Sequence, residues 1–293
     1  MRNILVTGAT GTQGGAVVDH LLADSEQWEI YGLTRDATGD GAEALEARGV
    51  TVVEGDMTDA DRMQELVDGM DAVYGVTTFM EQGTDVEVEQ GVTLAEAAAD
   101  AGVDHFVYSS VGSADADTGL PHFESKWAVE QRIEELGLPA TVVRPVFFMQ
   151  NFASMMRDDI VDGQLTMPLH EGVSLAVVDA TDIGGAVVAA LSDPDTFLGE
   201  IVTLAGDDLT LEAFAAAFSD QLGHEVEPVH ADVEEYREMA GDELADMFQW
   251  FNDVGYDIDM AALAEYGIET TSFEAYLADS EMWQPTAAAA GAQ

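Results

Sequence analysis

Residues 3–22 read NILVTGATGTQGGAVVDHLL, and this stretch decides how the rest of the chain is organised. Residues 4–6 form a short apolar run that is typical of a buried parallel strand. Glycines follow at Gly8, Gly11 and Gly14, and apolar residues at helical spacing come next. A strand, a glycine-rich turn and a helix in this order are the context that a dinucleotide-binding fingerprint requires.

Each glycine has its own physical role in this interpretation. Gly8 permits the tight turn, a side chain at Gly11 would hold a diphosphate away, and Gly14 lets the helix pack against the strand. The helix N-terminus offers unpaired N–H groups and the positive end of the helix dipole, which both favour an anion. Thr10 and Thr12 add hydroxyl groups, and Thr12 is also a candidate helix cap. An ordinary βα turn is the alternative, but the flanking strand and helix favour nucleotide binding.

The composition limits the class of protein. The chain has 293 residues, of which 47% are hydrophobic, enough for the core of one large domain or of a domain with a smaller lobe. No apolar run is long enough to span a bilayer, and no leader-like segment precedes the first strand, so we expect a cytoplasmic protein that binds no membrane. Without cysteine, the chain has no disulfide, thiolate nucleophile or Cys-type zinc site. We expect no metal site.

The charge is strongly negative, with 9 basic and 58 acidic residues and a net charge of −49. Such a chain repels nucleic acid, so we expect no direct nucleic-acid partner. Disorder is the usual alternative for an acidic chain, but the apolar content argues against it. A folded protein with a carboxylate surface screened by high salt, as in salt-accumulating halophiles, fits both observations. Lys126 is the only lysine, which marks it as a candidate functional residue.

Apolar runs and helical patterns alternate along the first half of the chain. The pattern predicts strands at 28–33, 51–53, 72–75, 105–110, 141–145, 174–178 and 201–204. It predicts helices near 59, at 86–101, 123–136, 183–191 (capped by Asp182) and 211–222, and a helical, acidic remainder to about 283. This alternation predicts an α/β fold with a doubly wound parallel (Rossmann) sheet and a small C-terminal α+β lobe.

We expect three segments along the chain. Residues 1–152 form the dinucleotide-binding domain. Residues 153–283 form a smaller substrate or partner lobe, some of whose strands return to the main domain. Residues 284–293 form a frayed tail.

Polar residues follow several strands at the sheet edge where ligands of open α/β sheets collect. Arg35 favours the 2′-phosphate of NADP, whereas the adjacent Asp36 would bind the ribose of NAD. Because arginine is scarce here, we favour NADP(H), with NAD(H) as a possible cofactor and a solvated loop arginine as the alternative. Asp56 is placed to meet the adenine amino group or to cap the next helix. Ser110 ends the strand at 105–110, and we expect it to face the ligand crevice at this edge of the sheet.

The segment HFESK at 122–126 carries the expected chemistry. A short-chain dehydrogenase has a tyrosine four residues before a lysine, which binds the nicotinamide ribose and lowers the pKa of the tyrosine. Here the lysine is present as Lys126, but His122 replaces the tyrosine. A histidine at this place is also a common surface or capping residue.

In these motifs and their order, the chain resembles the NmrA-like family of atypical short-chain dehydrogenases. The matching stretches are VTGATGTQGG (6–15), TR (34–35), GDM (55–57), VTTF (76–79), HFESK (122–126) and RPVFFMQNF (144–152). The spacing G-x-x-G-x-x-G is similar to that of extended and atypical members rather than typical dehydrogenases. The resemblance implies a Rossmann domain that binds NADP(H) and a C-terminal lobe that closes the cleft.

The resemblance also implies site residues. Lys126 and His122 would be catalytic. Cofactor contacts would come from Gly8, Thr10, Gly11, Thr12, Gln13, Gly14, Arg35, Asp56, Met57, Thr77, Thr78, Phe79, Lys126, Pro145 and Phe148. Substrate contacts would come from Ser110, Phe147 and Asn151. The apolar run 147–156 would be a helix that floors the substrate pocket, with plain core packing as the alternative.

Two functions from different classes remain open. In the first, an NADPH-dependent reductase transfers hydride to a flat acceptor such as a quinone, Lys126 holds the ribose, and His122 or water supplies the proton. In the second, a non-catalytic NADP(H) sensor is recognised by a partner protein, which requires different affinities for the cofactor states. A structural Rossmann protein without nucleotide is a third interpretation, which the fingerprint disfavours. We expect a monomer or homodimer.

Overall fold

The computed structural model describes residues 1–23 and 27–284 and divides into two compact units. The first unit comprises Met1–Pro145, Ala180–Thr203 and Ala261–Ile268. The second comprises Val146–Asp179, Leu204–Met260 and the described residues from Glu269 onward. Apart from Gln284, the tail expected at 284–293 lies outside the described residues.

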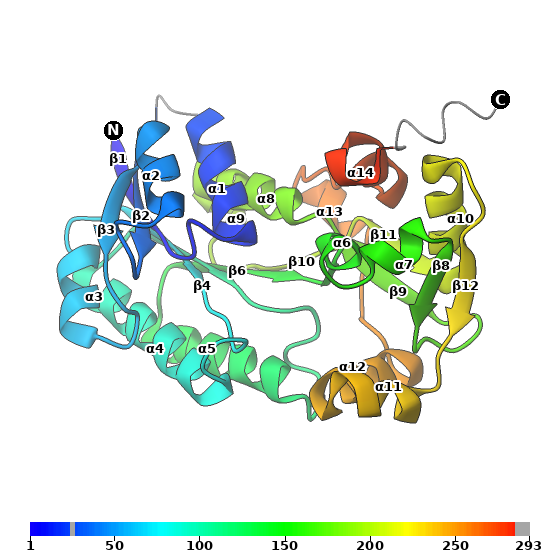
Figure 1. The fold of residues 1–293 in the computed structure, drawn as a ribbon. Helices are drawn as coiled ribbons and strands as arrows, with labels where there is room; N and C mark the ends of the chain where they lie inside the picture. Colours follow the sequence, from blue (N-terminus) through cyan, green and yellow to red (C-terminus); the bar gives the residue numbers. More distant parts are fainter. Residues whose placement is uncertain (24–26, 285–293) are drawn as a thin grey trace. The chain divides into compact units, whose positions relative to one another are not determined.

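A seven-stranded sheet forms the first unit, in the order β10-β6-β5-β4-β1-β2-β3 (Figure 1). Its strands are β1 (Arg2–Val6), β2 (Trp28–Thr34), β3 (Thr51–Glu54), β4 (Ala72–Val76), β5 (His105–Ser109), β6 (Ala140–Pro145) and β10 (Ile201–Leu204). From β3 to β6 every neighbouring pair is parallel. The strand order reverses at β1, which pairs with both β2 and β4. Such a switch point is where doubly wound sheets bind ligands, and it confirms the predicted Rossmann fold.

Helices cover both faces of this sheet (Figure 1). One face carries α1 (Thr12–Ala23), α2 (Asp40–Ala47) and α8 (Ala180–Ser192), and the other carries α3 (Ala60–Val67), α4 (Thr84–Ala101) and α5 (Pro121–Leu136). Two short helices, α9 (Pro194–Phe197) and α13 (Ala262–Glu265), complete the unit. Because both faces are covered, the central strands are apolar almost throughout, as in β1, where Ile4, Leu5 and Val6 are fully buried.

Glycines let the helices pack closely. A Cβ on Gly184 of α8 would lie 2.4 Å from the Ala16 carbonyl oxygen of α1, and one on Gly91 of α4 would lie 2.5 Å from Val129 of α5. Both distances are shorter than atoms tolerate, so these two helix pairs approach closely only because glycine is present.

Small sheets and short helices form the second unit. Strands β7 (Phe147–Phe148), β9 (Ser174–Val178) and β11 (Asp207–Thr210) form one sheet, and β8 (Gln164–Met167) pairs in parallel with β12 (Glu227–His230). The helices are α6 (Gln150–Met155), α7 (Arg157–Val161), α10 (Leu211–Leu222), α11 (Val233–Ala240), α12 (Asp242–Asp253), α14 (Phe273–Asp279) and a 3₁₀ turn at Glu281–Trp283. The core is aromatic: the Phe152 ring lies 5.0 Å from Phe214 and 5.2 Å from Phe273, centroid to centroid.

The structure corrects three expectations. The helix expected over 147–156 begins at Gln150, because Phe147 and Phe148 pair with β9. Asp182 lies in the first turn of α8 and does not precede the helix. Strands β8 and β12 occupy segments with no strand-like apolar run, and β12 interrupts the remainder expected to be helical. Within the described residues, no helix has both the length and the apolar character needed to cross a membrane.

Candidate functional site

The glycine turn between β1 and α1 has the backbone geometry that the sequence predicts. Gly8 has φ +59°, and a Cβ on Gly14 would lie 2.3 Å from the Gly8 carbonyl oxygen. The Gly11 amide donates to that oxygen at 2.8 Å, and the Gly15 amide donates to the Gly11 carbonyl oxygen at 2.8 Å. Gly8, Gly11 and the flanking Thr10 are exposed, so the main chain is bare where an anion would meet the start of α1.

Two hydroxyl groups fasten this turn to neighbouring strands. The Ser109 hydroxyl, at the end of β5, donates to Gln13 Oε1 at 2.6 Å. The Thr7 hydroxyl donates to the Val76 carbonyl oxygen at 3.0 Å and accepts from the Val76 amide at 2.8 Å, which joins the ends of β1 and β4. Sequence reasoning named Gln13 but missed Thr7, whose partner lies 69 residues away.

Arg35 follows β2 and is already paired with a carboxylate. Its guanidinium makes two contacts with Glu81, Nη2 to Oε1 at 3.0 Å and Nη1 to Oε2 at 2.5 Å, and both side chains are about half exposed. The bond to Glu81 raises the pKa of Arg35. The neighbouring Asp36 accepts from the hydroxyl and the amide of Thr38, which lowers the pKa of its carboxyl. No sequence pattern pointed to Glu81, which lies in the loop between β4 and α4.

Asp56 lies just after β3 and forms a local turn. Its Oδ1 accepts from the Thr58 amide at 2.9 Å and hydroxyl at 2.8 Å, and these bonds lower the pKa of Asp56. Asp59 caps α3 by accepting from the Arg62 amide at 3.0 Å, so the cap role considered for Asp56 is wrong. Met57 packs against the core beneath α3 and α4.

Lys126 points from α5 into the buried end of β4. Its ammonium group donates to the Thr77 carbonyl oxygen at 2.8 Å and the Thr77 hydroxyl at 3.0 Å, and it pairs with Glu87 Oε1 at 3.0 Å. Glu87, in the first turn of α4, is fully buried. Burial lowers the pKa of Lys126, and the charge of Glu87 opposes that effect. Sequence reasoning found Lys126 and Thr77 but missed Glu87.

An aromatic stack joins the helix that carries Lys126 to the loop after β4. The His122 and Phe79 rings are stacked with centroids 4.9 Å apart and planes 24° apart, and the Phe123 ring meets His122 edge-on. Both members of the stack are half-buried. Between Phe79 and Thr77, Thr78 is exposed, and its hydroxyl accepts from the Met80 amide at 3.3 Å.

A second buried ion pair lies at the ends of β5 and β6. Arg144 donates to both carboxylate oxygens of Glu130, at 3.0 and 2.7 Å, and to Asp115 at 2.8 Å. Ser110, predicted to face the substrate, is buried, and its hydroxyl donates to Glu130. Pro145 is also buried, and its carbonyl oxygen accepts from the Gly112 amide at 2.9 Å.

The remaining predicted contacts belong to the second unit. Phe147 is only 6% exposed and packs against Phe248 and Phe251, which places it in the aromatic core. Phe148 and Asn151 are half-buried at β7 and the start of α6. The predicted residues from Gly8 to Pro145 thus lie on the first unit, and these three lie on the second.

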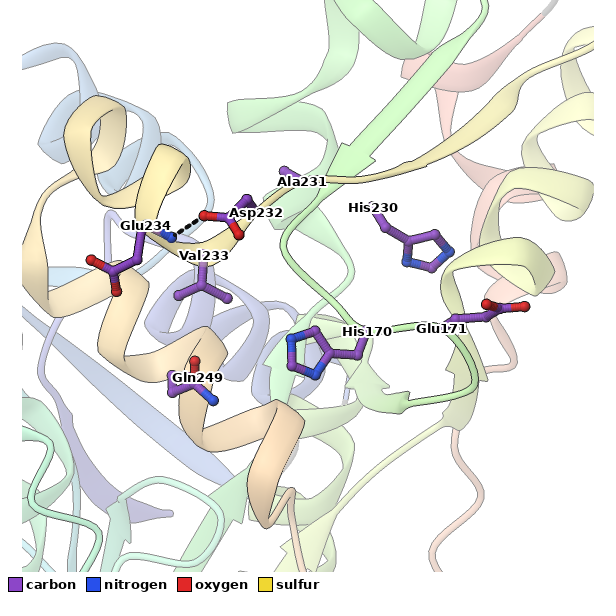
Figure 2. A pocket seen from close by; sticks show the side chains of 8 residues that line it. All are labelled: His170, Glu171, His230, Ala231, Asp232, Val233, Glu234 and Gln249. Carbon is purple, nitrogen blue, oxygen red and sulfur yellow. Dashed lines mark hydrogen bonds between the residues drawn. The ribbon is translucent and has the colours of Figure 1, made fainter.

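A hollow of about 480 Å³ opens in the second unit (Figure 2). It is lined by His170, Glu171, His230, Ala231, Asp232, Val233, Glu234 and Gln249, and none of the predicted site residues is among them. Asp232 caps α11 by accepting from the Glu234 amide at 2.9 Å, the bond drawn in Figure 2. Within the described chain no group of three or more His, Asp or Glu side chains is arranged to hold a metal ion.

The fold and the glycine turn define a Rossmann-type α/β protein. The model of the NmrA-like family matches residues 1–277. The chain therefore belongs to the NmrA-like family.

Two curated relatives are similar in sequence. An NAD(P)H azoreductase of Xenophilus azovorans is 36% identical over 193 residues, which cover 65% of this chain and 64% of the azoreductase. An NmrA-like family domain-containing protein of Dictyostelium discoideum is 29% identical over 297 residues, covering 94% of this chain and 97% of its own length. The chain thus spans less than two thirds of the azoreductase.

Solved structures share the fold. An NADPH-dependent quinone oxidoreductase of Escherichia coli complexed with NADPH has TM-score 0.81 and 24% identity, covering 92% of this chain and 97% of its own. The Citrobacter sp. triphenylmethane reductase complexed with NADP(H) has TM-score 0.80 and 20% identity, with coverages of 94% and 98%. Nmra, a negative transcriptional regulator, in complex with NADP has TM-score 0.77 and 23% identity, with 94% coverage of both chains.

Proposed function

We propose that this protein binds a nicotinamide dinucleotide, preferably NADP(H), and reduces a small quinone-like acceptor. The observation that carries the proposal is the bare glycine turn at the switch point of the sheet. A Cβ on Gly14 would collide with the backbone of Gly8, and Gly11 stands exposed before the first turn of α1. Such a turn fits a diphosphate, because the N–H groups of the helix start and its dipole both favour negative charge.

In this proposal, different residues of the chain bind different parts of the cofactor and the acceptor. Gly11, Thr12 and Gln13 would hold the diphosphate, Arg35 the 2′-phosphate, and Asp56 the adenine amino group. The bound cofactor supplies the hydride. Lys126 presents a positive charge that stabilises the negative charge developing on an acceptor oxygen, and the proton comes from His122 or water.

The relatives support an acceptor that is flat and aromatic. An azoreductase, a triphenylmethane reductase and a quinone oxidoreductase all act on conjugated molecules by their names. Such acceptors need little acid catalysis, which suits a site with His122 in place of tyrosine. The stacked Phe79 and His122 rings provide an aromatic surface against which a conjugated acceptor would pack.

A second candidate function is a non-catalytic NADP(H) sensor that acts through a partner protein. It is favoured by the likeness to Nmra, a regulator whose structures contain NADP or NAD. Such a sensor would act on a protein rather than on DNA, because a chain with a net charge of −49 is repelled by the phosphates of DNA. Either function suits a monomer or homodimer in the cytoplasm.

The test is fluorescence titration with NADPH at high salt, followed by NADPH oxidation with a panel of quinones. Gly14→Ala should abolish binding, whereas Gly15→Ala should retain it, because its Cβ would lie 3.7 Å from the nearest atom. Gly11→Val, placed on the exposed turn, should lose binding while keeping the wild-type circular dichroism. Nanomolar NADPH binding by Gly11→Val would refute the phosphate assignment. Turnover that Lys126→Ala loses identifies a reductase, and tight binding without turnover identifies the sensor.

A further inference from the structure

The ammonium group of Lys126 uses all its hydrogen bonds inside the protein. Its three N–H donors meet three acceptors, the Thr77 carbonyl oxygen, the Thr77 hydroxyl and Glu87 Oε1, at 2.8 to 3.0 Å. An ammonium group has three donors and no acceptor, so this set is complete. Lys126 therefore meets a ligand as a fixed positive charge.

Glu87 is the partner that makes this arrangement possible. Its Oε1 accepts from Lys126 and from the Thr77 hydroxyl at 3.3 Å, and its Oε2 accepts from the Ser125 hydroxyl at 2.5 Å. The side chain is fully buried, because Gly91 one turn further along α4 lets that helix approach α5 closely. A buried carboxylate held by three donors is fixed in position.

The Glu87 carboxylate opposes the effect of burial on the pKa of Lys126. Burial alone favours the neutral amine, and an adjacent opposite charge restores the ammonium form. Among the described residues, Tyr108 of β5 also faces the ammonium, with its ring centroid 5.7 Å from Nζ. Burial raises the pKa of Tyr108, so its phenol stays neutral and gives no counter-charge.

The two titratable residues one turn before and after Lys126 on α5 interact with other side chains. His122 stacks on Phe79, and Glu130 pairs with Arg144. Glu87 is thus the counter-ion that directly contacts the lysine.

We propose that Glu87 is a positioning residue that keeps Lys126 protonated and fixed at the carboxyl end of β4. In a chain that lacks tyrosine at position 122, the Glu87–Lys126 pair supplies the fixed positive charge for the nicotinamide end of the cofactor and for the acceptor. This consequence rests on the proposed function. The protonation of Lys126 itself does not, and it can be measured without any cofactor.

The uniqueness of Lys126 makes a direct measurement possible. Protein with ¹³C at the lysine ε-carbon, expressed without a lysine-containing tag, gives a single side-chain NMR signal that is titrated at high salt. The wild-type protein gives the reference midpoint for Lys126. In Glu87→Gln, which keeps shape but removes charge, the midpoint should move to lower pH. Equal midpoints in the two proteins would overturn the proposal.

Glu130→Gln is the matched control, since it removes the charge of another buried glutamate that pairs with a cation in the same unit. It should leave the Lys126 midpoint where it is in wild type. If Glu87→Gln does not fold, Ser125→Ala replaces it, because this variant removes only the bond to Oε2 and should lower the midpoint by a smaller amount. A wild-type midpoint in Ser125→Ala would then overturn the proposal.

A second arm measures the dissociation constant of NADPH against pH for each variant. Above its lowered midpoint, Glu87→Gln should lose affinity by about tenfold per pH unit, because only the protonated lysine binds. A purely structural role for Glu87 would weaken binding equally at every pH and would overturn the proposal. If wild type does not bind NADPH, the proposed function fails, and the NMR titration still decides the part played by Glu87.

Discussion

The two units of the molecule differ in what they bury. In the first unit the interior holds complete polar clusters, such as Lys126 with Glu87 and Arg144 with Glu130. In the second, Asp179 is the one polar or charged side chain buried among the described residues, and the centre is a cluster of tilted phenylalanine rings around Phe152.

This contrast separates two ways of stabilising a protein. Buried ion pairs gain little net stability, since removal from water costs about as much as their attraction returns, but they fix charges in place. Aromatic packing stabilises through area and dispersion and places no charges. The interior of the first unit therefore fixes charges in place, as a functional site requires. The interior of the second unit mainly stabilises the fold.

The largest effect should come from the second unit. Phe152→Ala removes a fully buried ring that contacts Phe147, Phe214, Phe218 and Phe273, and should lower the free energy of unfolding by about 3–5 kcal/mol. Denaturant titration at high salt measures the change. Met155→Ala, on the exposed side of the same helix, should change it by less than about 0.5 kcal/mol. Similar losses in both variants would show that the aromatic cluster does not hold the unit together.

A smaller effect should appear in the dependence of stability on pH, with opposite sign in the two units. In the first unit His105 is buried, and burial, helped by Arg2, lowers its pKa to about 4. Its Nε2 hydrogen-bonds the Thr141 hydroxyl at 2.8 Å, and that hydroxyl donates to the Phe197 carbonyl oxygen at 2.7 Å. Thr141 thus accepts from a neutral imidazole.

The sign follows from which state binds more protons. Between about pH 4 and 6.5 the unfolded chain protonates His105 and the folded chain does not, so its contribution is full above pH 6.5 and falls on acidification. His105→Asn should flatten this fall, which is at most about 1.4 kcal/mol per pH unit for one proton. Melting temperatures of wild type and variant from pH 4 to 8 test it. Parallel curves would exclude the effect.

In the second unit His230 should behave in the opposite way. Bonds to the Leu169 carbonyl oxygen and to Glu212 raise its pKa. Its contribution is therefore present at low pH and is lost as pH rises through the raised pKa. His230→Asn should reduce stability most at low pH, and the loss should become smaller as pH rises through the raised pKa of His230. A loss that does not vary with pH would contradict the charged pair.

The smallest effect concerns the choice of cofactor. Glu81 occupies the guanidinium fork of Arg35, so a 2′-phosphate must compete with it. Glu81→Gln should tighten NADPH binding relative to NADH by about 1.4- to 5-fold, the range expected for an exposed pair worth about 0.2–1 kcal/mol. Isothermal titration with both cofactors gives the ratio.

Glu65→Gln, which breaks an exposed arginine pair elsewhere on the unit, should leave that ratio unchanged. An unchanged ratio in Glu81→Gln as well would show that Arg35 does not read the 2′-phosphate.

The sequence predicted what depends on neighbours along the chain. The glycine turn, the alternation of strands and helices, and Lys126 are visible because each rests on a local pattern. The helix at Leu211–Leu222 agrees with its expected bounds because Thr210 caps it and Gly223 ends it.

The rest depends on contacts between distant segments. Glu81 and Glu87 are two acidic residues among 58 and become distinctive only when folding brings Arg35 and Lys126 against them. Strands β8 and β12 exist because they pair with each other across about sixty residues. Ser110 ends the expected strand, but only the position of Glu130 decides where its hydroxyl donates.

The order of synthesis on the ribosome gives the seventh strand a further importance. The first 145 residues contain six strands of the large sheet, but β10, which pairs with β6, and α8, which packs on α1, emerge only after the whole of 146–179 has been made. Until then the nascent chain carries an open β6 edge, and such an edge invites pairing with other chains. The large sheet is therefore completed only when β10, its edge strand beside β6, has been made.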